Sequence, residues 1–506
     1  MNVLLIYPRY PTTFWSFQHA LKFVAKKAAF PPLGLLTVAS LLPEDWNLRL
    51  IDLNSTDLCD GDLQWADCVM ISAMLVQRES ADQVLSRCAT LAKPVIAGGP
   101  LFTALKEEYL PRVSHLVAGE GEETIPLFVE DFKAGCARKM YQSEEFPDLT
   151  QSPIPRWDLI RVNDYASMMI QNSRGCPFNC EFCDVTTLFG HRPRLKTPVQ
   201  FVAELQAIYD MGWRGGVFVV DDNFIANKKA IKEMLPSVIH WMEQRDHPFT
   251  FFTEASINIA EDDELLDMMV RAGFDSVFIG LETPNEESLR ECSKTQNLGR
   301  DLVASIHKLH GRGLAVMGGY IVGFDNDDHN IFARQKRFIQ ETGVVTAMVG
   351  LLQALPNTRL WRRLRDENRL AAPSTGDNTD GSVNFIPAMG RQNLIRGYVT
   401  LLRAIYSPKL FHQRLFTFLE NYNKPTCPMR QPGMEQVPAL IKSIFYMGVL
   451  GNGISQWYFW KTLVKTLAWY RQALPEAITL MIYGHHFRKV ARRLSRDALL
   501  VIEYSG

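Results

Sequence analysis

Short apolar segments alternate with helical patterns along much of this chain, and this alternation limits the fold more than any other feature. Strands separated by helices pair in parallel, because the helix carries the chain back to the same end of the sheet. The sequence therefore predicts an α/β protein, with a five-stranded doubly wound parallel sheet in residues 1–145 and six βα units in residues 166–365. The first group of expected strands is Val3–Tyr7, Leu48–Asp52, Val69–Ala73, Val95–Gly98 and His115–Gly119, and the second is Met168–Asn172, Val217–Val220, Phe249–Thr253, Ser276–Gly280, Ala315–Val322 and Ala347–Leu352.

A linker and a third region complete the predicted organisation. Residues 146–165 predict a linker, since three prolines punctuate them. Residues 366–506 favour a mainly helical domain, with helices expected at Leu394–Tyr406 and Leu410–Asn421. The polar stretch Asp377–Ser382 is expected to return as a loop toward the strand ends.

Two stretches of the third region bear on contact with membranes. Ser443–Trp460 carries no charge, but Gly, Asn, Ser and Gln interrupt it. A spanning helix needs about 20 mainly apolar residues, so we do not expect this stretch to cross a bilayer. The basic tail His485–Arg496 is amphipathic, which is compatible with peripheral membrane contact. A packed terminal helix with a solvated basic face is the alternative that we favour.

Three of the nine cysteines stand together, at Cys176, Cys180 and Cys183. An odd cysteine number in a chain of this length does not indicate a disulfide framework and favours a reduced, cytoplasmic compartment. Three thiolates can hold three corners of a cubane cluster and leave the fourth iron without a protein ligand, whereas iron–sulfur clusters normally take four cysteines. The alternative is a zinc site, which would need a fourth ligand such as His191.

The segment Arg174–Cys183 resembles the signature of the radical S-adenosylmethionine (SAM) superfamily. The resemblance implies that the three cysteines are the metal ligands of a [4Fe–4S] cluster whose open iron binds SAM. In that family the cluster cleaves SAM to a 5′-deoxyadenosyl radical, which abstracts hydrogen from carbons that no acid or base could deprotonate. It also implies that the six βα units form a partial (β/α)₆ barrel.

The resemblance implies a SAM site at the carboxyl ends of the barrel strands. Asp221 and Asp222 occupy the place of the family's Gly-Gly-Glu motif, where a carboxylate meets the methionine ammonium. A strand bearing glycines leaves room for the adenine plane. The expected SAM-binding residues are Asp221, Asp222, Glu254, Ser256, Glu282, Gly319 and Gly323.

The N-terminal region resembles the cobalamin-binding class of the same superfamily, because glycine-bearing turns follow its strands. No G-x-G-x-x-G follows the first strand, which argues against a dinucleotide. The expected cobalamin-binding residues are Met74, Leu75, Val76, Gln77, Gly98, Gly99, Pro100, Gly119 and Glu120.

One departure concerns the cobalt. The Asp-x-His-x-x-Gly motif that places an imidazole on cobalt is absent, and His19 is expected to be an ordinary surface or interdomain histidine. The lower face of the corrin would then meet the loop Met74–Arg78, as in relatives without a histidine ligand. The alternative is a vestigial domain that binds no cobalamin.

The third region resembles the C-terminal domain (DUF4070) of a branch that includes hopanoid C-methylases. In many cobalamin-type members of the superfamily a Leu-Pro-Gly-Thr turn lies at the edge of the barrel, and Asn357 here replaces its glycine. The resemblance implies a cobalamin-dependent radical SAM methyltransferase acting on an unactivated carbon. The alternatives are a rearrangement, ring contraction or oxidative cyclisation with the same cofactors, and a cobalamin- or SAM-sensing module without turnover.

The expected partners follow from charge and from the resemblance. The formal charge is −1, so nothing favours a nucleic-acid partner. A methylthiotransferase acting on RNA is disfavoured as well, because the other N-terminal cysteines lack the spacing of a second cluster. We expect a small-molecule, lipid or peptide substrate and a flavodoxin- or ferredoxin-type reductant.

Overall fold

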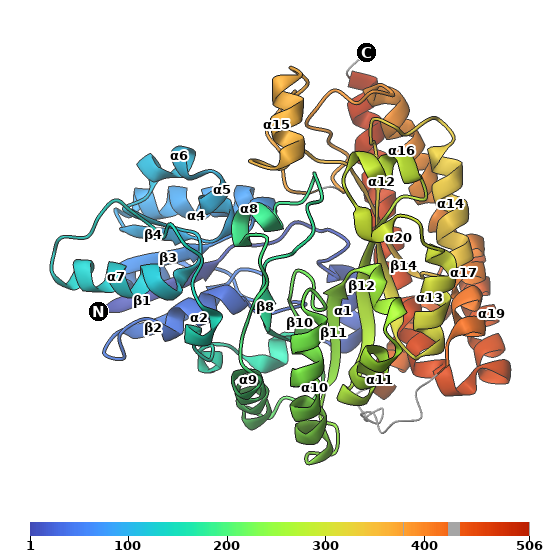
Figure 1. Ribbon diagram of the computed structural model, residues 1–506, viewed down its shortest axis with the longest axis horizontal. Helices are drawn as coiled ribbons and strands as arrows, with labels where there is room; N and C mark the ends of the chain where they lie inside the picture. Colours follow the sequence, from blue (N-terminus) through green and yellow to red (C-terminus); the bar gives the residue numbers. More distant parts are fainter. Residues whose placement is uncertain (378, 424–435, 505–506) are drawn as a thin grey trace.

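The computed structural model describes residues 1–377, 379–423 and 436–504, so Asn378 of the predicted loop lies outside the described residues. Figure 1 shows the N-terminal sheet at the left, the second sheet in the middle and the C-terminal helices at the right. The predicted α/β class, with a mainly helical C-terminal part, is confirmed.

The N-terminal sheet is parallel, with strand order β2-β1-β3-β4-β5-β6. It has one strand more than predicted, because the three-residue β6 is too short to give an alternating pattern. Residues Val3–Ile6 of β1 are buried on both faces, as expected for a central strand covered by helices. The strands are β1 Asn2–Tyr7, β2 Asn47–Asp52, β3 Cys68–Ser72, β4 Val95–Gly98, β5 His115–Ala118 and β6 Met140–Gln142, and the helices are α1 Gln18–Val24, α2 Leu33–Ser40, α3 Asp60–Trp65, α4 Arg78–Thr90, α5 Pro100–Ala104, α6 Lys106–Tyr109 and α7 Gly121–Lys133.

The second sheet is the predicted six-stranded partial barrel, with parallel order β14-β13-β12-β11-β10-β7. Capping residues mark the N-terminal ends of several of its helices. In α9, for example, the Thr197 hydroxyl accepts from the backbone N–H of Gln200, and the Gln200 side chain accepts from the backbone N–H of Thr197. The strands are β7 Met168–Ile170, β10 Gly216–Val219, β11 Thr250–Ala255, β12 Phe274–Glu282, β13 Ala315–Val322 and β14 Thr346–Leu351, and the helices are α9 Pro198–Asp210, α10 Lys228–Glu243, α11 Asp263–Ala272, α12 Glu286–Glu291, α13 Leu302–Gly311 and α14 Ile331–Thr342.

The cysteine loop leaves the barrel between β7 and α9. It contains the short helix α8 (Val185–Phe189) and an antiparallel pair, β8 (Ser173–Arg174) with β9 (Arg194–Leu195). The pair closes the loop onto itself, so that the cysteines lie in a turn held at both ends.

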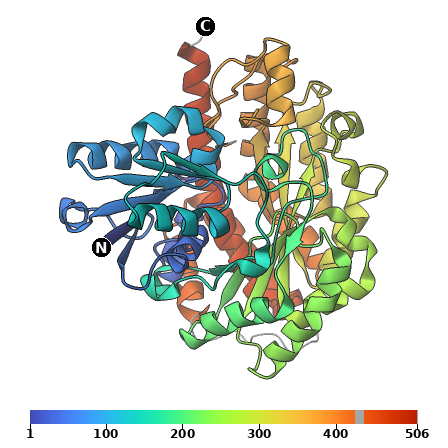
Figure 2. The ribbon, with the colours of Figure 1, turned by 60° about the vertical axis from the view of Figure 1, so that its left-hand side comes forward.

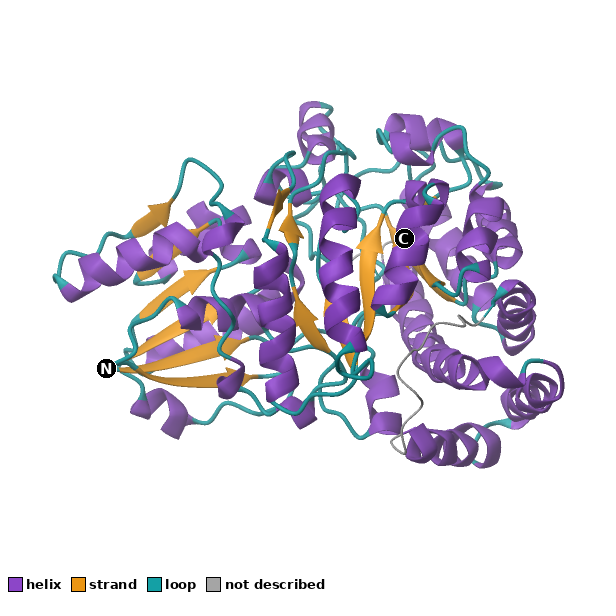
Figure 3. Cartoon of the chain, turned by 60° about the horizontal axis from the view of Figure 1, so that its bottom comes forward, coloured by secondary structure: helices purple, strands orange, loops and turns teal. Residues whose placement is uncertain are grey.

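The C-terminal region packs on the barrel as helices. One continuous core joins barrel residues to Phe14 and Phe17 near the N-terminus and to Phe411 and Phe487 near the C-terminus. Figure 2 shows α20 passing behind the junction of the two sheets, and Figure 3 shows helices flanking the strands of both sheets. The elements are α15 Arg359–Asp366, α16 Arg391–Ile405, α17 Pro408–Asn421, α18 Gln436–Ser443, the π-helical segment η8 Ile444–Val449, α19 Gly453–Trp469 and α20 Leu474–Tyr504.

Within the described ranges, every helix is too short or too polar to cross a bilayer. The tail His485–Arg496 belongs to α20 and packs on the N-terminal segment. The His486 ring accepts at Nδ1 from the backbone N–H of His19 (3.3 Å) and approaches the carbonyls of Thr13 and Phe14 (both 3.1 Å). The favoured prediction of a packed terminal helix is confirmed, and His19 is an interdomain histidine.

Candidate active site

A cavity of about 1030 Å³ separates the two sheets. The carboxyl ends of β1 to β5 form one wall of this cavity, and the barrel interior forms the other. We call them the sheet wall and the barrel wall. Parallel sheets place their ligand sites at this edge of the strands.

The sheet wall is shaped by glycines. Gly99 has φ +88°, and a side chain there would place its Cβ 2.5 Å from Ser72 Oγ and 3.3 Å from the carbonyl of Ala73. Only glycine fits such a position, because both the backbone conformation and the space exclude a side chain. Gly119 (φ +82°) faces open space in the cavity lining.

Most residues expected to bind cobalamin lie on this wall. Met74, Val76, Gly98, Gly99, Pro100, Gly119 and Glu120 line the cavity. Leu75 and Gln77 do not. The buried Gln77 side chain instead orders the loop, since its Oε1 accepts from the backbone N–H of Met74 (2.8 Å) and its Nε2 donates to the carbonyl of Pro8.

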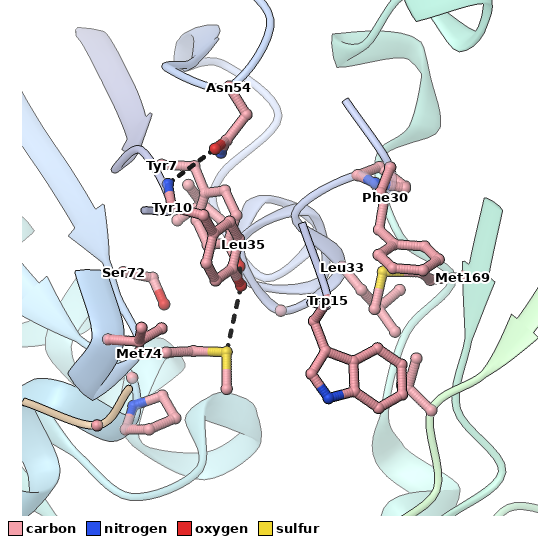
Figure 4. A pocket seen from close by; sticks show the side chains of 18 of the residues that line it. Tyr7, Tyr10, Trp15, Phe30, Leu33, Leu35, Asn54, Ser72, Met74 and Met169 are labelled. Carbon is pink, nitrogen blue, oxygen red and sulfur yellow. Dashed lines mark hydrogen bonds between the residues drawn. The ribbon is translucent and has the colours of Figure 1, made fainter. Parts of the chain in front are cut away.

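Two tyrosines that the sequence analysis missed stand over the Met74 loop. The hydroxyls of Tyr7 and Tyr10 are 2.5 Å apart, and the Tyr10 hydroxyl donates to Met74 Sδ at 3.2 Å (Figure 4). Burial raises the pKa of Tyr10 to about 12, so this phenol stays protonated at neutral pH. The backbone N–H of Tyr10 donates to Asn54 Oδ1 (2.9 Å). The polar groups of this wall are thus satisfied by one another.

Glu120, one of the residues expected to bind cobalamin, forms ion pairs within the protein. Its carboxylate binds Arg174 (2.5 Å) and Arg194 (2.5 Å) of the cysteine loop, and Glu122 also binds Arg174 (2.8 Å). All four side chains are largely buried. These ion pairs join the sheet wall to the cysteine loop, so the carboxylate of Glu120 is already engaged.

The three cysteines lie in the barrel half, next to amide donors. Gln296 Nε2 is 3.6 Å from Cys180 Sγ, and Asn223 Nδ2 is 4.0 Å from Cys176 Sγ. Burial raises the pKa of the Cys176 thiol, and that of Cys183 well above the usual value. Among the described residues, no group of three or more His, Cys, Asp or Glu side chains is gathered closely enough for a single metal ion.

The cysteine loop is held by its neighbours. Gly175 has φ +93°, and a Cβ there would lie 2.9 to 3.1 Å from three carbonyl oxygens of residues 189–192. From α15, Arg363 Nε donates to Glu181 Oε1 (2.8 Å), and Arg359 Nη1 donates to the carbonyl of Asn179 (2.9 Å). The ligand geometry therefore depends on the helix that follows the barrel.

Among the described residues, no salt bridge reaches the carboxylates of Asp222 and Glu254 on the barrel wall, although the charge of Arg174 acts on the first and that of Lys294 on the second. The Asp222 carboxylate accepts from the backbone N–H of Gly175 (3.1 Å), and both Asp222 and Glu254 line the cavity. Burial and the charges of Asp221 and Asp184 raise the pKa of Asp222 to about 7, and burial and the charge of Asp222 raise that of Glu254 to about 8. A cation in this position would offset the unfavourable free energy of burying the two negative charges close together.

The other expected SAM residues fall into two groups. Glu282 and Gly319 line the cavity, but Glu282 pairs with Lys294 (2.7 Å), and the ring of Phe278 fills the space beside Gly319. Asp221 also lines it, yet its carboxylate accepts from the backbone N–H of Asn172 (2.7 Å) and from Ser173 Oγ (2.6 Å).

Ser256 and Gly323 do not line the cavity. The backbone N–H of Ser256 donates to Asn223 Oδ1 (3.2 Å), which orients the amide near Cys176. A Cβ at Gly323 would meet Leu394 at 3.0 Å, so this glycine lets α16 approach the barrel.

Aromatic side chains between the walls were not predicted. Trp15 lies nearly parallel to Phe218 (6.4 Å between ring centroids) and contacts Phe278 (5.0 Å), while Phe30 contacts Phe218 (5.4 Å). Figure 4 shows Trp15 and Phe30 across the cavity from Met74. The signal was present, because Phe218 alternates with the buried core residues Val217 and Val219.

The third region closes the cavity, as predicted for the loop Asp377–Ser382. Gly376, Asp377 and Thr379 line it, and a Cβ at Gly376 would lie 2.8 Å from the backbone N of Val76. Asn357 adopts the left-handed conformation that the predicted turn requires (φ +65°).

The residues present fit the cofactors that the family implies. Three thiols with amide donors aimed at the sulfurs suit an iron–sulfur cluster, and the unpaired carboxylates beside them suit an ammonium group. The glycine-shaped sheet wall suits a large planar ligand.

Family models match three parts of the chain: the B12 binding domain (residues 25–129), the Radical SAM superfamily (residues 170–333) and a domain of unknown function, DUF4070 (residues 358–498). An uncharacterized methyltransferase of Synechocystis is 39% identical, covering 97% of this chain and 93% of that protein. The hopanoid C-2 methylase of Rhodopseudomonas palustris is 32% identical, covering 100% and 96%.

Solved structures share the fold. The cobalamin-dependent radical SAM enzyme OxsB matches with a TM-score of 0.63 at 13% identity, covering 99% of this chain and 80% of that one. The radical SAM methyltransferase TsrM from Kitasatospora setae matches with a TM-score of 0.61 at 15% identity, covering 93% and 99%. With its three family domains and full-length relatives, this chain belongs to the cobalamin-dependent radical SAM methyltransferases that carry a DUF4070 domain and use a [4Fe–4S] cluster, SAM and cobalamin.

Proposed function

We propose that this enzyme methylates an unactivated carbon of an apolar, hopanoid-like lipid held between the two walls of the cavity. The observation that carries the proposal is the aromatic group Trp15, Phe30, Phe218 and Phe278, which lies between the sheet wall and the barrel wall. Aromatic faces bind extended apolar skeletons through contact area. The name of the relative from Rhodopseudomonas palustris supports a hopanoid as substrate.

We assign the cluster to Cys176, Cys180 and Cys183, and the methionine ammonium of SAM to Asp222 and Glu254. When bound, cluster, SAM and cobalamin supply the radical and the methyl group. Asn223 and Gln296 donate toward the sulfurs, and Ser256 orients Asn223. The chain's task is to position the ligands.

On the sheet wall, we assign the corrin to the turns at Gly98–Pro100 and Gly119 and its lower face to Met74 and Val76. The Tyr10 hydroxyl donates to the Met74 thioether and so orients it. Leu75 and Gln77 support the same loop without reaching the cavity. Asp221, Glu120 and Glu282 hold other protein groups and position their neighbours.

Radical SAM enzymes need a reductant and act on small molecules. We propose a flavodoxin- or ferredoxin-type donor, a cytoplasmic location and peripheral contact with a membrane through the C-terminal region. A membrane-embedded substrate would make that contact useful, because the carbon to be methylated would never enter free solution.

The test is an anaerobic reaction with CD₃-labelled SAM and a hopanoid extract in detergent. We expect the label in a product one methyl group heavier than the substrate. A product without label would favour rearrangement or cyclisation, and cofactor binding without 5′-deoxyadenosine would favour a sensing module. Label transfer to a soluble peptide but to no lipid would overturn the assigned substrate class.

A further inference from the structure

The outer face of the C-terminal helices exposes an unusual amount of apolar surface. We call residues 436–469, which comprise α18, η8 and α19, the apolar hairpin. It holds 11 of the 19 exposed large apolar side chains found among the described residues. These are Val437, Ile441, Phe445, Val449, Leu450, Ile454, Trp457, Trp460, Val464, Leu467 and Trp469.

Close packing and hydrogen bonds hold the tip of the apolar hairpin together. Gly448 lies so close to α19 that a Cβ there would be 2.9 Å from the Phe459 ring. Its carbonyl accepts from Gln456 Nε2 (2.6 Å) and from the indole N–H of Trp460 (3.0 Å). The carbonyl of Gly448 is therefore satisfied within the tip, while Leu450 and Ile454 beside it are 61% and 71% exposed. Leaving water costs such a carbonyl no hydrogen bond.

All formal charges between residues 436 and 475 are positive: Lys442, Lys461, Lys465 and Arg471. Lys461 lies over the Trp457 ring (4.8 Å) and Lys465 over the Phe416 ring (3.8 Å), so their stems run along apolar surface. Aromatic and basic side chains beside aliphatic ones are typical of helices that lie in a bilayer interface.

Further cations lie on the neighbouring elements. Lys442 donates to the carbonyl of Lys22 on α1 (3.2 Å), and Lys22 lies 4.1 Å from the centre of the Tyr446 ring. Partial burial and then the charge of Lys489 on α20 lower the pKa of Lys22, and partial burial followed by the charges of Lys489 and Arg493 lowers the pKa of His19. An anionic surface would relieve this repulsion.

A second copy of the chain fits the apolar hairpin less well than a lipid surface does. A twofold contact would bring the same face against itself, and so would place positive charges opposite positive charges around the apolar centre. A lipid surface supplies what both parts of the face require, acyl chains for the apolar tip and anionic headgroups for the lysines.

We propose that the apolar hairpin docks the enzyme on an anionic lipid bilayer, with Leu450 and Ile454 at the inserted tip. This inference deepens the proposed contact with membranes and names its surface. Figure 1 shows α19 at the edge of the molecule away from the N-terminal sheet. The hairpin still reaches the cavity through α1, because Phe23 contacts Tyr446 (5.7 Å between centroids) while Leu21 lines the cavity.

The experiment is flotation of the full-length protein with vesicles of phosphatidylcholine and phosphatidylglycerol, without SAM or reductant. We expect Leu450→Glu and Ile454→Glu each to lower vesicle binding by about tenfold, since an inserted carboxylate has to leave water. Raising the salt to 0.5 M should weaken wild-type binding several-fold, and vesicles of phosphatidylcholine alone should bind less protein.

Val199→Glu is the matched control, because Val199 is an apolar residue, 79% exposed, on α9 in the barrel half. It should bind vesicles as the wild type does, and all variants should keep the wild-type melting temperature. Equal binding by the wild type and the hairpin variants would overturn the proposal. So would a wild-type dimer that ignores vesicles and dissociates in Leu450→Glu, which would identify a second copy as the occupant. Methyl transfer to a detergent-dispersed substrate is measured separately, so failure of either proposal leaves the other testable.

Discussion

The sheet wall and the barrel wall face the same cavity with opposite chemistry. On the sheet wall, glycines remove side chains, and the hydroxyls, amides and backbone groups around Tyr10 satisfy one another. On the barrel wall, burial and like charge raise the pKa values of Asp222 and Glu254, and the Cys176 thiol lies near Asp222. One wall thus selects its ligand by shape and the other by charge. A larger side chain should therefore impair ligand binding at the sheet wall, and loss of a carboxylate charge should impair ligand binding at the barrel wall.

The largest effect is expected from removing a cluster thiol of the barrel half. Cys180→Ala should lower the iron content from about four atoms per chain to near zero and abolish the brown colour after anaerobic purification. Cys88→Ala is the matched control, because Cys88 is a buried free thiol of the N-terminal region and should leave iron unchanged. Stoichiometric zinc bound by the wild type in place of iron would contradict the cluster assignment.

Bulk on the sheet wall should have the next largest effect. Gly99→Val should lower cobalamin affinity by about 100-fold or more, because the backbone at φ +88° and the contact with Ser72 leave no room for a side chain. The measurement is retention of hydroxocobalamin through gel filtration. Gly135→Ala, with similar φ (+70°) but open space around it, is the control for backbone strain. If Gly99→Val binds the corrin normally, this turn does not face it.

Charge on the barrel wall can be tested without change of shape. Glu254→Gln should weaken SAM binding to the reconstituted enzyme by about 10- to 100-fold, as expected for a partly buried ion pair. Cobalamin retention should not change. A variant that loses both ligands together would show that the two walls are not independent.

The most gradual effect expected is a dependence of SAM affinity on pH. Because the pKa values of Asp222 and Glu254 are raised to about 7 and about 8, both carboxyls take up protons as the pH falls through this range. A cationic ligand binds the ionised forms, so SAM affinity should fall as the pH is lowered from about 8.5 to about 6. The fall should be up to about tenfold per pH unit for each carboxyl that takes up a proton. Calorimetry in two buffers would count the protons released. The slope should be shallower in Glu254→Gln, and an unchanged slope would exclude Glu254 as its source.

Local patterns in the chain were enough for much of the fold. The alternation of apolar strands and helices predicted both parallel sheets, and only the short β6 was missed, since three residues carry no period. The same reasoning placed the polar residues at the strand ends, because carboxyl ends of parallel strands share one edge. It could not tell which carboxylates were free. Asp221 and Asp222 are neighbours in sequence, yet only Asp221 is enclosed by Asn172 and Ser173.

By itself, the sequence determined the chemistry this protein can perform, because cysteine spacing, strand-end carboxylates and turn glycines are local features of the chain. The tertiary structure decided which of those groups remain available to a ligand. It engaged Glu120 and Glu282 with arginine and lysine partners distant in sequence, brought Trp15 and Phe278 together, and left the apolar hairpin uncovered. Each of these outcomes depends on contacts between distant segments, and no local pattern specifies which distant segment will supply the partner.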